Sequence, residues 1–206
     1  MVRVLAVADE EVPTFESRAR GLDVDLVVSA GDLPWDYLER LVELLDVPGV
    51  FVPGNHEPSS GRGAPRGMTS ADDRVVEVAG LRLGGLGGCV RYNGGPHQYT
   101  QAEYVRRADR LVARLGDGRL DVLLTHAPPF RLGDEPDAAH VGVEAWHDLL
   151  ERTAPRWHLH GHIHPYGLAK PDRQVGDTTV RNVVPWTVMD VEPGTVLVGD
   201  RRESTW

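Results

Sequence analysis

The chain has 206 residues, of which 41% are hydrophobic and 26% are charged. This length and composition suit one globular domain over residues 1–206, and we expect residues from about 192 to 206 to form a tail. Lys and Arg number 22 against 31 Asp and Glu, which gives a formal net charge of −9. That balance excludes binding of nucleic acid through a broad basic surface, because such binding requires clustered cations.

The sequence has no apolar run near the ~20 residues that a membrane-spanning helix requires. It opens on a short apolar stretch that lacks the longer apolar region and the cleavage site of a signal peptide. The single cysteine, Cys89, excludes an internal disulfide and a cysteine-based metal cluster. We therefore expect a protein of the reducing cytoplasm, with no membrane partner.

Apolar runs that fit buried strands alternate with segments whose apolar residues recur at helical spacing. The expected strands cover residues 2–8, 26–30, 50–52, 120–125 and 157–160, and the expected helices cover residues 37–45, 104–115 and 143–152. Strands separated by helices indicate an α/β protein with a largely parallel sheet. Later strands, joined by short turns, favour a second sheet that is antiparallel or mixed, at residues 75–78, 81–86, 178–184 and 186–191. Residues 59–70 and residues 84–99, a glycine-rich segment, are expected loops.

Each expected buried strand in the alternating part of the chain is followed by side chains that can bind a metal ion. In chain order these are Asp9-Glu10-Glu11, Asp32, Asn55-His56-Glu57, His126 and His162-Ile163-His164. We expect them to lie close together, because ligands of open α/β sheets bind beyond the carboxyl ends of the strands. Oxygen and imidazole donors suit Mn, Fe, Zn, Ni or Co, and so many donors suit two ions that share a bridging carboxylate.

The local sequence also indicates how these side chains are held. A glycine precedes Asp32, Asn55 and His162, and glycine permits tight turns and a close approach of the backbone. His162 and His164 are two residues apart, so in an extended backbone they face the same side of the chain. They are therefore expected to serve neighbouring metal ions.

The ordered set of motifs resembles the calcineurin-like metallophosphoesterases, which carry Asp-x-His, Gly-Asp, Gly-Asn-His-Asp/Glu, a lone His and Gly-His-x-His. The corresponding residues here, in the same order, are Asp9-x-Glu11, Gly31-Asp32, Gly54-Asn55-His56-Glu57, His126 and Gly161-His162-Ile163-His164. The resemblance spans at least residues 4–165. A lone Gly-Asp carries no information, whereas the ordered set, with every motif at a strand end, is highly specific.

The resemblance implies an α/β fold in which two mixed sheets and flanking helices form a four-layer α-β-β-α sandwich. It also implies two divalent metal ions, with Mn favoured and Fe, Zn, Ni, Co or Mg as alternatives. Matched position by position, the ligands are Asp9 and His164 on the first ion, Asp32 as the bridging carboxylate, and Asn55, His126 and His162 on the second ion.

The same resemblance implies hydrolysis of a small phosphate ester by a hydroxide that the two ions generate from water. His56 corresponds to the family histidine that contacts the phosphate and protonates the leaving oxygen, with Asp32 and Asn55 beside it. We expect phosphodiesters over monoesters, because many soluble family members cleave diesters. The alternatives are a phosphomonoesterase and a non-catalytic scaffold of the same fold. A decayed scaffold site would lack several ligands, whereas this motif set departs at one position.

That departure is Glu11, which stands where the family usually has His. Asp9 and Glu11 would face the same side of an extended segment, so Glu11 is expected to reach the first ion. A carboxylate there adds negative charge and hardness, which favours Mn over softer ions.

Two further stretches are candidates for shaping the substrate end of the site. Arg91 fits bidentate binding of phosphate oxygens, and it fits equally well a salt bridge with a neighbouring carboxylate. The segment Asp137-Ala138-Ala139-His140 lies between the last two metal motifs.

Each candidate ligand, taken alone, also fits an ordinary structural role. Asp32 suits a helix N-cap, Asn55 a turn and His126 a loop. His158 and His160 alternate along an expected strand, where they suit a hydrogen-bonding face, with His160 close enough to support a ligand. The ordered set favours the metal site over a coincidence of such roles.

Overall fold

The computed structural model describes residues 1–13, 15, 19, 21–56, 64–167 and 170–194. Its helices are α2 (Trp35–Leu45), α3 (Gln101–Leu115) and α4 (Ala145–Thr153). Its strands are β1 (Val2–Val7), β2 (Leu26–Ser29), β3 (Gly49–Phe51), β4 (Met68–Ser70), β5 (Arg74–Val78), β6 (Leu81–Leu86), β7 (Cys89–Val90), β8 (Gln98–Tyr99), β9 (Val122–Thr125), β10 (Trp157–His160), β11 (Arg173–Val175), β12 (Thr178–Asn182) and β13 (Trp186–Val191).

The strands form two mixed sheets and one short pair. The first sheet has the order β13-β1-β2-β3-β4, in which β13 is antiparallel to β1 and the other neighbours are parallel. The second sheet has the order β11-β12-β10-β9-β6-β5, in which the four central strands are parallel and the two edge strands are antiparallel. The strands β7 and β8 pair with each other in parallel.

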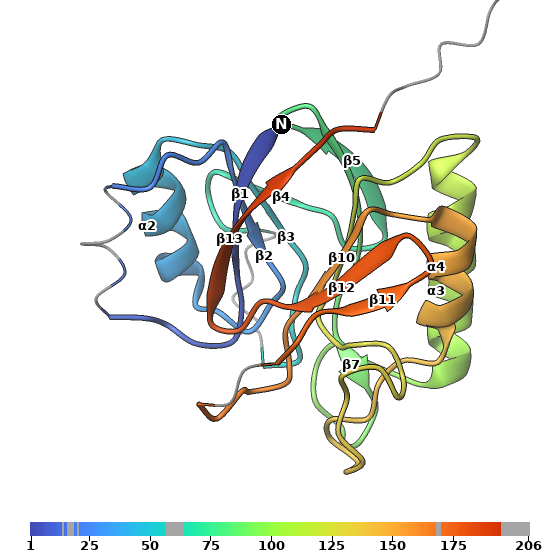
Figure 1. The fold of residues 1–206 in the computed structure, drawn as a ribbon. Coiled ribbons are helices and arrows are strands. Elements are labelled where there is room, and N and C mark those ends of the chain that lie inside the picture. The colour runs from blue at the N-terminus through green and yellow to red at the C-terminus, as the bar shows by residue number, and fades with distance from the viewer. Residues whose placement is uncertain (14, 16–18, 20, 57–63, 168–169, 195–206) are drawn as a thin grey trace, which may run out of the picture.

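Alternation along the strands explains the layering. In β1, Val4 and Ala6 face the second sheet and share one core with Leu83 and Leu124, whereas Leu5 on the opposite face packs toward α2. A strand buried on both faces reads as a continuous apolar run, as β1 and β2 do. The outer face of the second sheet packs against α3 and α4. Figure 1 shows α2 on one side of the two sheets and α3 with α4 on the other, which confirms the α-β-β-α sandwich.

Helix α3 begins with a complete capping box. Its N-cap Thr100 accepts a hydrogen bond from the backbone of Glu103, and the Glu103 carboxylate accepts one from the Thr100 backbone, so two unpaired amides are satisfied. Its buried face includes Tyr104, whose ring centroid lies 5.0 Å from that of Trp146 in α4. None of the helices in the described ranges is long and apolar enough to cross a membrane.

Some expectations about strands were wrong. The expected strand at 186–191 was assigned to the second sheet, but β13 joins the first sheet through pairing from Val2 with Val191 to Val7 with Trp186. The expected loop 59–70 includes β4, which extends the first sheet beside β3, while its residues 59–63 lie outside the described residues. Most of the expected tail, residues 195–206, also lies outside them.

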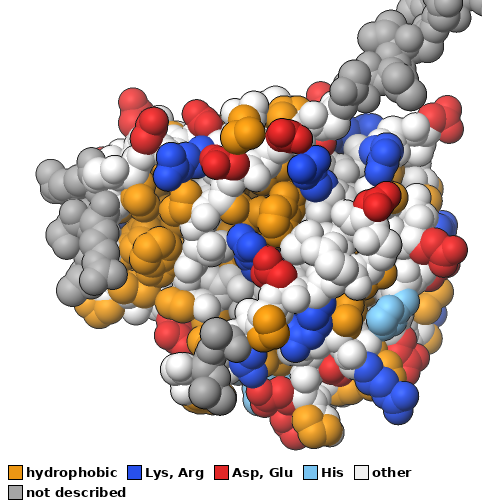
Figure 2. Space-filling view, in the orientation of Figure 1, with side chains coloured by type: hydrophobic (Ala, Val, Ile, Leu, Met, Phe, Trp, Pro, Cys, Tyr) orange, Lys and Arg blue, Asp and Glu red, His pale blue; other side chains and the backbone are white. Residues whose placement is uncertain are grey.

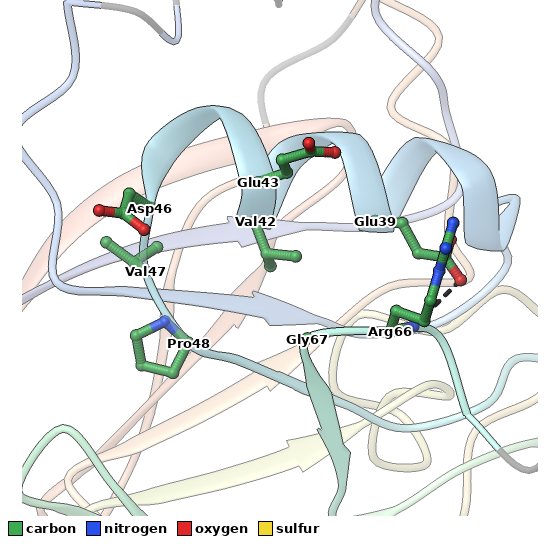
Figure 3. A pocket seen from close by; sticks show the side chains of 8 residues that line it. All are labelled: Glu39, Val42, Glu43, Asp46, Val47, Pro48, Arg66 and Gly67. Atoms are coloured by element: carbon green, nitrogen blue, oxygen red, sulfur yellow. Dashed lines mark hydrogen bonds and ion pairs between the residues drawn. The ribbon is translucent and has the colours of Figure 1, made fainter.

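A hollow of about 540 Å³ lies between α2 and the segment that leads into β4. Figure 3 shows Glu39 of α2 against Arg66, whose guanidinium donates to the Glu39 carboxylate over 2.7 Å, while Glu43 and Asp46 lie further toward the C-terminal end of the helix. None of the expected metal ligands lines this hollow. The expected metal ligands follow the strand ends instead.

Candidate metal centre

The expected ligands that follow five different strands converge at one edge of the sandwich. Asp9, Asp32 and Asn55 follow β1, β2 and β3 of the first sheet, and His126 and His162 follow β9 and β10 of the second. Asp9, His126 and His162 each offer a ligand atom, and these atoms lie within 4.8 Å of one another. The rings of His126 and His162 are tilted at a centroid distance of 4.8 Å. The carboxyl ends of parallel strands from both sheets thus meet at one cluster.

Asp32 is at the centre of the hydrogen bonds in this cluster. Its carboxylate accepts from the backbone N–H of His56 over 2.7 Å and lies 2.9 Å from the His56 ring Nδ1. The same carboxylate lies 3.3 Å from Nε2 of His126. Although burial opposes the charge, the hydrogen bonds with His126 and His56 hold the pKa of Asp32 well below its usual range. Asp32 is not the N-cap of α2, because Pro34 occupies that position.

Two of the histidines are oriented by backbone carbonyls. Nδ1 of His126 donates to the Ala30 carbonyl over 2.7 Å, and Nε2 of His162 donates to the Ala139 carbonyl over 2.8 Å. These bonds leave Nε2 of His126 and Nδ1 of His162 as the atoms that can bind a cation. A second ring nitrogen held by a carbonyl is the arrangement that metal-binding histidines use, so this donor set fits divalent metal ions.

Charge in the cluster also fits a cation. Burial raises the pKa of the Asp9 carboxyl to about 6, and its Oδ2 accepts a hydrogen bond from the His162 backbone N–H over 2.9 Å. Burial lowers the pKa of His126, but the hydrogen bond with Asp32 outweighs it and raises that pKa to about 9. Burial lowers the pKa of His162 to about 3, so this ring is a neutral donor. A buried group that favours a positive charge beside two carboxylates marks a place where a cation is stabilised.

Three glycines make the close approach possible, as the sequence predicted. A Cβ on Gly54 would collide with the Asp32 carboxylate, and a Cβ on Gly161 would collide with that of Asp9. A Cβ on Gly31 would lie 2.9 Å from Nδ1 of His126. The adjoining ligands also adopt left-handed backbone conformations, with φ of 62° at Asp9, 56° at Asp32 and 67° at His162. Strain of this kind is held only where the surrounding structure enforces it, and these three residues all belong to the candidate site.

The left-handed conformations overturn two expectations about which side chains face the same way. After β1 the backbone turns at Asp9, so Asp9 and Glu11 are not on one side of an extended strand. The Glu11 carboxylate instead lies 4.0 Å from Arg40, and the neighbouring Glu10 lies 2.8 Å from Nδ1 of His164.

The pair His162 and His164 also does not lie on an extended backbone, because β10 ends at His160 and His162 has a left-handed φ. His162 points to the buried cluster, while His164 is one-third exposed and pairs with Glu10. The contact of Glu10 with His164 was not predicted, since only a regular alternation was assumed for this turn. The ligand roles of Glu11 and His164 remain predictions.

Arg91 forms a salt bridge, which the sequence left open as the alternative to phosphate binding. Its guanidinium donates to the Gln98 carbonyl over 3.2 Å and to the Glu103 carboxylate over 3.0 Å. Since Glu103 belongs to the first turn of α3, this ion pair ties the β7–β8 loop to that helix. The use of Arg91 for phosphate binding stays a prediction, and the structure brings it to this carboxylate rather than to the metal ligands.

Two segments reach the cluster in ways that the sequence did not reveal. Asp137 accepts hydrogen bonds from the backbone N–H groups of Ala139 and His140, so the turn presents the Ala139 carbonyl to His162. On another side, the hydroxyl of Tyr92 lies 3.4 Å from Nδ2 of Asn55. Asn55 in turn places its Oδ1 3.0 Å from Nε2 of His126. Neither contact has a sequence motif, because each depends on how a loop folds over the site.

Two more buried histidines lie on β10 and not in the cluster. Nε2 of His158 lies 2.8 Å from the Thr125 hydroxyl, and Nδ1 of His160 donates to the Gly161 carbonyl over 3.0 Å. Burial lowers the pKa of His158 well below its ordinary value and that of His160 to about 4. Cys89 is buried, and burial raises the pKa of its thiol to about 12, as expected of a packed residue rather than a nucleophile.

Comparison with known proteins agrees with this fold and donor set. Residues 6–166 match the calcineurin-like phosphoesterase family, and the chain therefore belongs to that family. Membership supports metal-dependent hydrolysis of phosphate esters in general. No curated protein matches the chain in sequence.

Solved structures give the same architecture. The crystal structure of TT1561 from Thermus thermophilus is 16% identical, with 88% of each chain covered and a TM-score of 0.61. A hypothetical protein from the same organism is 16% identical, with 87% of this chain and 75% of that chain covered and a TM-score of 0.51. Vacuolar Protein Sorting 29 from Cryptosporidium parvum is 13% identical, with 88% and 73% covered and a TM-score of 0.45. The two Thermus likenesses show the fold.

Proposed function

We propose that this chain hydrolyses small phosphate esters, with a preference for phosphodiesters, and that it uses two divalent metal ions, Mn before Fe, Zn, Ni, Co or Mg. The observation that carries the proposal is the convergence of Asp9, Asp32, Asn55, His126 and His162 from the ends of five strands. In His126 and His162, one ring nitrogen already donates a hydrogen bond to a backbone carbonyl, which leaves the other nitrogen for a metal ion. The preference for diesters follows the family resemblance, and the preference for Mn follows the oxygen-rich donor set.

Metal ions bound by these residues would lower the pKa of a water molecule and withdraw charge from the phosphoryl oxygens. The chain itself supplies the arrangement. Asp32 lies 3.3 Å from Nε2 of His126 and orients His56 through its backbone and its ring. Asn55 is almost fully buried, so its amide lies at a fixed place beside His126.

We assign proton delivery to His56. Its side chain is 72% exposed, whereas its Nδ1 is held 2.9 Å from Asp32, so the ring stands at the solvent side of the cluster. A substrate on the metal site would meet this ring first. A protonated imidazole there stabilises charge on the phosphate and supplies a proton to the departing alkoxide.

The test is hydrolysis of four substrates by metal-stripped protein to which Mn, Ni, Zn or Mg is added back singly. The substrates are a phosphodiester and a monoester, each with an aryl and with an alkyl leaving group. We expect metal-restored cleavage, fastest for the diesters. An Asp32→Ala variant is expected to lose activity and metal binding together.

His56→Ala separates the two roles of that histidine. An alkoxide leaves with more difficulty than a phenolate, so loss of a general acid should slow the alkyl esters about 10²–10⁴-fold and the aryl esters much less. Equal losses for both leaving groups would mean that His56 only binds the phosphate. His147→Ala, an exposed histidine of α4, is the matched control and should behave as wild type. Tight metal binding without turnover of any ester would favour the scaffold alternative.

We also propose a cytoplasmic setting, a small-molecule substrate and no membrane partner. Cys89 is a free buried thiol, which suits a reducing compartment. Figure 2 shows acidic and basic side chains interspersed on one face, which is unlike the basic field that nucleic acid needs. A small ester suits the net charge of −9, because charge around the substrate is offset locally by the metal ions.

A further inference from the structure

The β7–β8 loop places one tyrosine against a candidate metal ligand. The Tyr92 hydroxyl accepts a hydrogen bond from Nδ2 of Asn55 over 3.4 Å, although the two residues are 37 positions apart. At its other end, the Asn55 amide directs Oδ1 toward His126 over 3.0 Å. The amide therefore lies between a phenol on one side and the metal cluster on the other.

The tyrosine is not free to swing away from this contact. Oε1 of Gln98 accepts hydrogen bonds from the backbone N–H groups of Tyr92 and Asn93, over 3.2 Å and 3.1 Å. Nε2 of Gln98 donates to the Asn93 side chain over 2.7 Å, and Gln98 itself is only 6% exposed. A buried amide that satisfies three partners in one loop closes that loop into a rigid unit.

Two further contacts fix the same loop to the body of the protein. Arg91 joins the Gln98 carbonyl to Glu103 at the start of α3. The ring of Tyr92 packs against the apolar cluster that contains Leu86 and Trp146. The hydroxyl is thus positioned by both the backbone and the ring.

A ligand amide needs this kind of support. The oxygen and nitrogen ends of an Asn side chain have nearly the same shape, so hydrogen bonds decide how the amide lies. A hydroxyl can accept or donate, but with a cation on the Oδ1 side it is the Nδ2 end that faces Tyr92. His56 also lies 3.3 Å from Nδ2, yet its ring is largely exposed and is held by Asp32.

We propose that Tyr92 is a positioning residue, which holds the Asn55 amide so that Oδ1 faces the metal cluster. This inference rests on the proposed function, because it assigns Asn55 as a metal ligand. Residues that orient a ligand through hydrogen bonds commonly contribute ~10–100-fold to metal affinity. Tyr92→Phe keeps the packed ring and removes the hydroxyl that contacts Nδ2 of Asn55.

The experiment is calorimetric titration of metal-free protein with Mn²⁺, for the wild type, Tyr92→Phe, Asn55→Ala and the double variant. We expect Tyr92→Phe to weaken one of the two Mn²⁺ equivalents about 10-fold. In the Asn55→Ala background the same change should have no further effect, because the tyrosine acts through that amide. Tyr99→Phe removes a hydroxyl from the adjacent strand, where the ring packs on Arg107, and should bind Mn²⁺ as the wild type does.

The outcomes are distinguishable. Unchanged Mn²⁺ affinity in Tyr92→Phe overturns the inference and leaves the proposed function intact. The same is true if Tyr92→Phe weakens binding equally with and without Asn55, because the tyrosine then acts elsewhere. A wild-type protein that binds no Mn²⁺, Zn²⁺ or Ni²⁺ overturns both. Thermal unfolding of metal-free Tyr92→Phe, expected within about 2 °C of the wild type, shows that the loss is not one of folding.

Discussion

The carboxylate of Asp9 accepts a hydrogen bond from the backbone N–H of His162 over 2.9 Å, and the two residues are 153 positions apart. One follows β1, an inner strand of the first sheet, and the other follows β10 of the second. Because the donor is a backbone N–H group, this hydrogen bond fixes the position of the His162 backbone relative to the Asp9 carboxylate. The two sheets are therefore joined at the point where the candidate ligands meet.

The first prediction concerns the glycine that permits this approach. In Gly161→Ala the new Cβ would collide with the Asp9 carboxylate, so one of the two must move. A displacement of about 1 Å at a reacting site can cost ~10²-fold in rate, and we expect a loss of that order in kcat with weaker metal binding. Gly94→Ala is the matched control for metal affinity, because a Cβ there meets no atom within 4 Å. Wild-type metal affinity in Gly161→Ala would refute the assignment of Asp9 as a metal ligand.

A second prediction concerns the turn that presents the Ala139 carbonyl to His162. Asp137→Ala removes the acceptor that fixes this turn, whereas Asp137→Asn retains an oxygen that the backbone N–H groups of Ala139 and His140 can still reach. We expect metal affinity to fall about 10-fold in the alanine variant and to change little in the asparagine variant. Comparison of the two variants distinguishes the effect of the turn from the effect of the Asp137 charge. If both variants lose affinity equally, the charge of Asp137 is what matters.

A third prediction concerns the pair formed by Asp32 and His126 in metal-free protein. The Asp32 carboxylate raises the pKa of the buried His126 to about 9. In Asp32→Asn the charge is absent and burial is opposed more weakly, by Asp9 and the Ala30 carbonyl, so the pKa of His126 should fall. Histidine NMR titration of the metal-free proteins measures this directly. Asp117→Asn, an exposed aspartate, should leave the His126 titration where it is, and a high pKa retained in Asp32→Asn would contradict the pairing.

The sequence predicted the main strands, the helices and the cluster, because each of these depends on local pattern. Nearly continuous apolar runs define β1 and β2 as strands buried on both faces, and a ligand placed directly after a strand must lie at its carboxyl end. The place of β13 was not predictable in this way. Its alternation is the same in either sheet, and only its pairing with β1, at the other end of the chain, decides between them.

The orientation of single side chains at the site was also not predictable from the sequence. The expectation for Glu11 assumed an extended backbone, but the left-handed Asp9 reverses the alternation and brings Glu10 to His164. A positive φ at a residue other than glycine is not encoded by a local motif, since surrounding contacts enforce it. The contact of Tyr92 with Asn55 is likewise a product of tertiary packing.

The last prediction is acid lability from the buried histidines of β10. In the folded protein the pKa of His158 is well below its ordinary value and that of His160 is about 4, both chiefly because of burial. The unfolded chain takes up these protons near pH 6.5, so the free energy of unfolding falls as the pH drops below about 6.5, by up to about 1.4 kcal/mol per pH unit for each histidine. Above that pH neither state binds the proton and the contribution is constant.

Urea unfolding of metal-free protein between pH 7 and pH 5 tests this. Asp9 acts in the opposite direction, because burial raises its pKa to about 6 and the folded state binds a proton there that the unfolded state releases. The informative comparison is therefore with His158→Gln, whose amide can still reach the Thr125 hydroxyl but does not titrate. Its unfolding free energy should depend on pH by about one proton less than that of the wild type. Equal slopes in the wild type and His158→Gln would mean that His158 does not stay neutral in the fold.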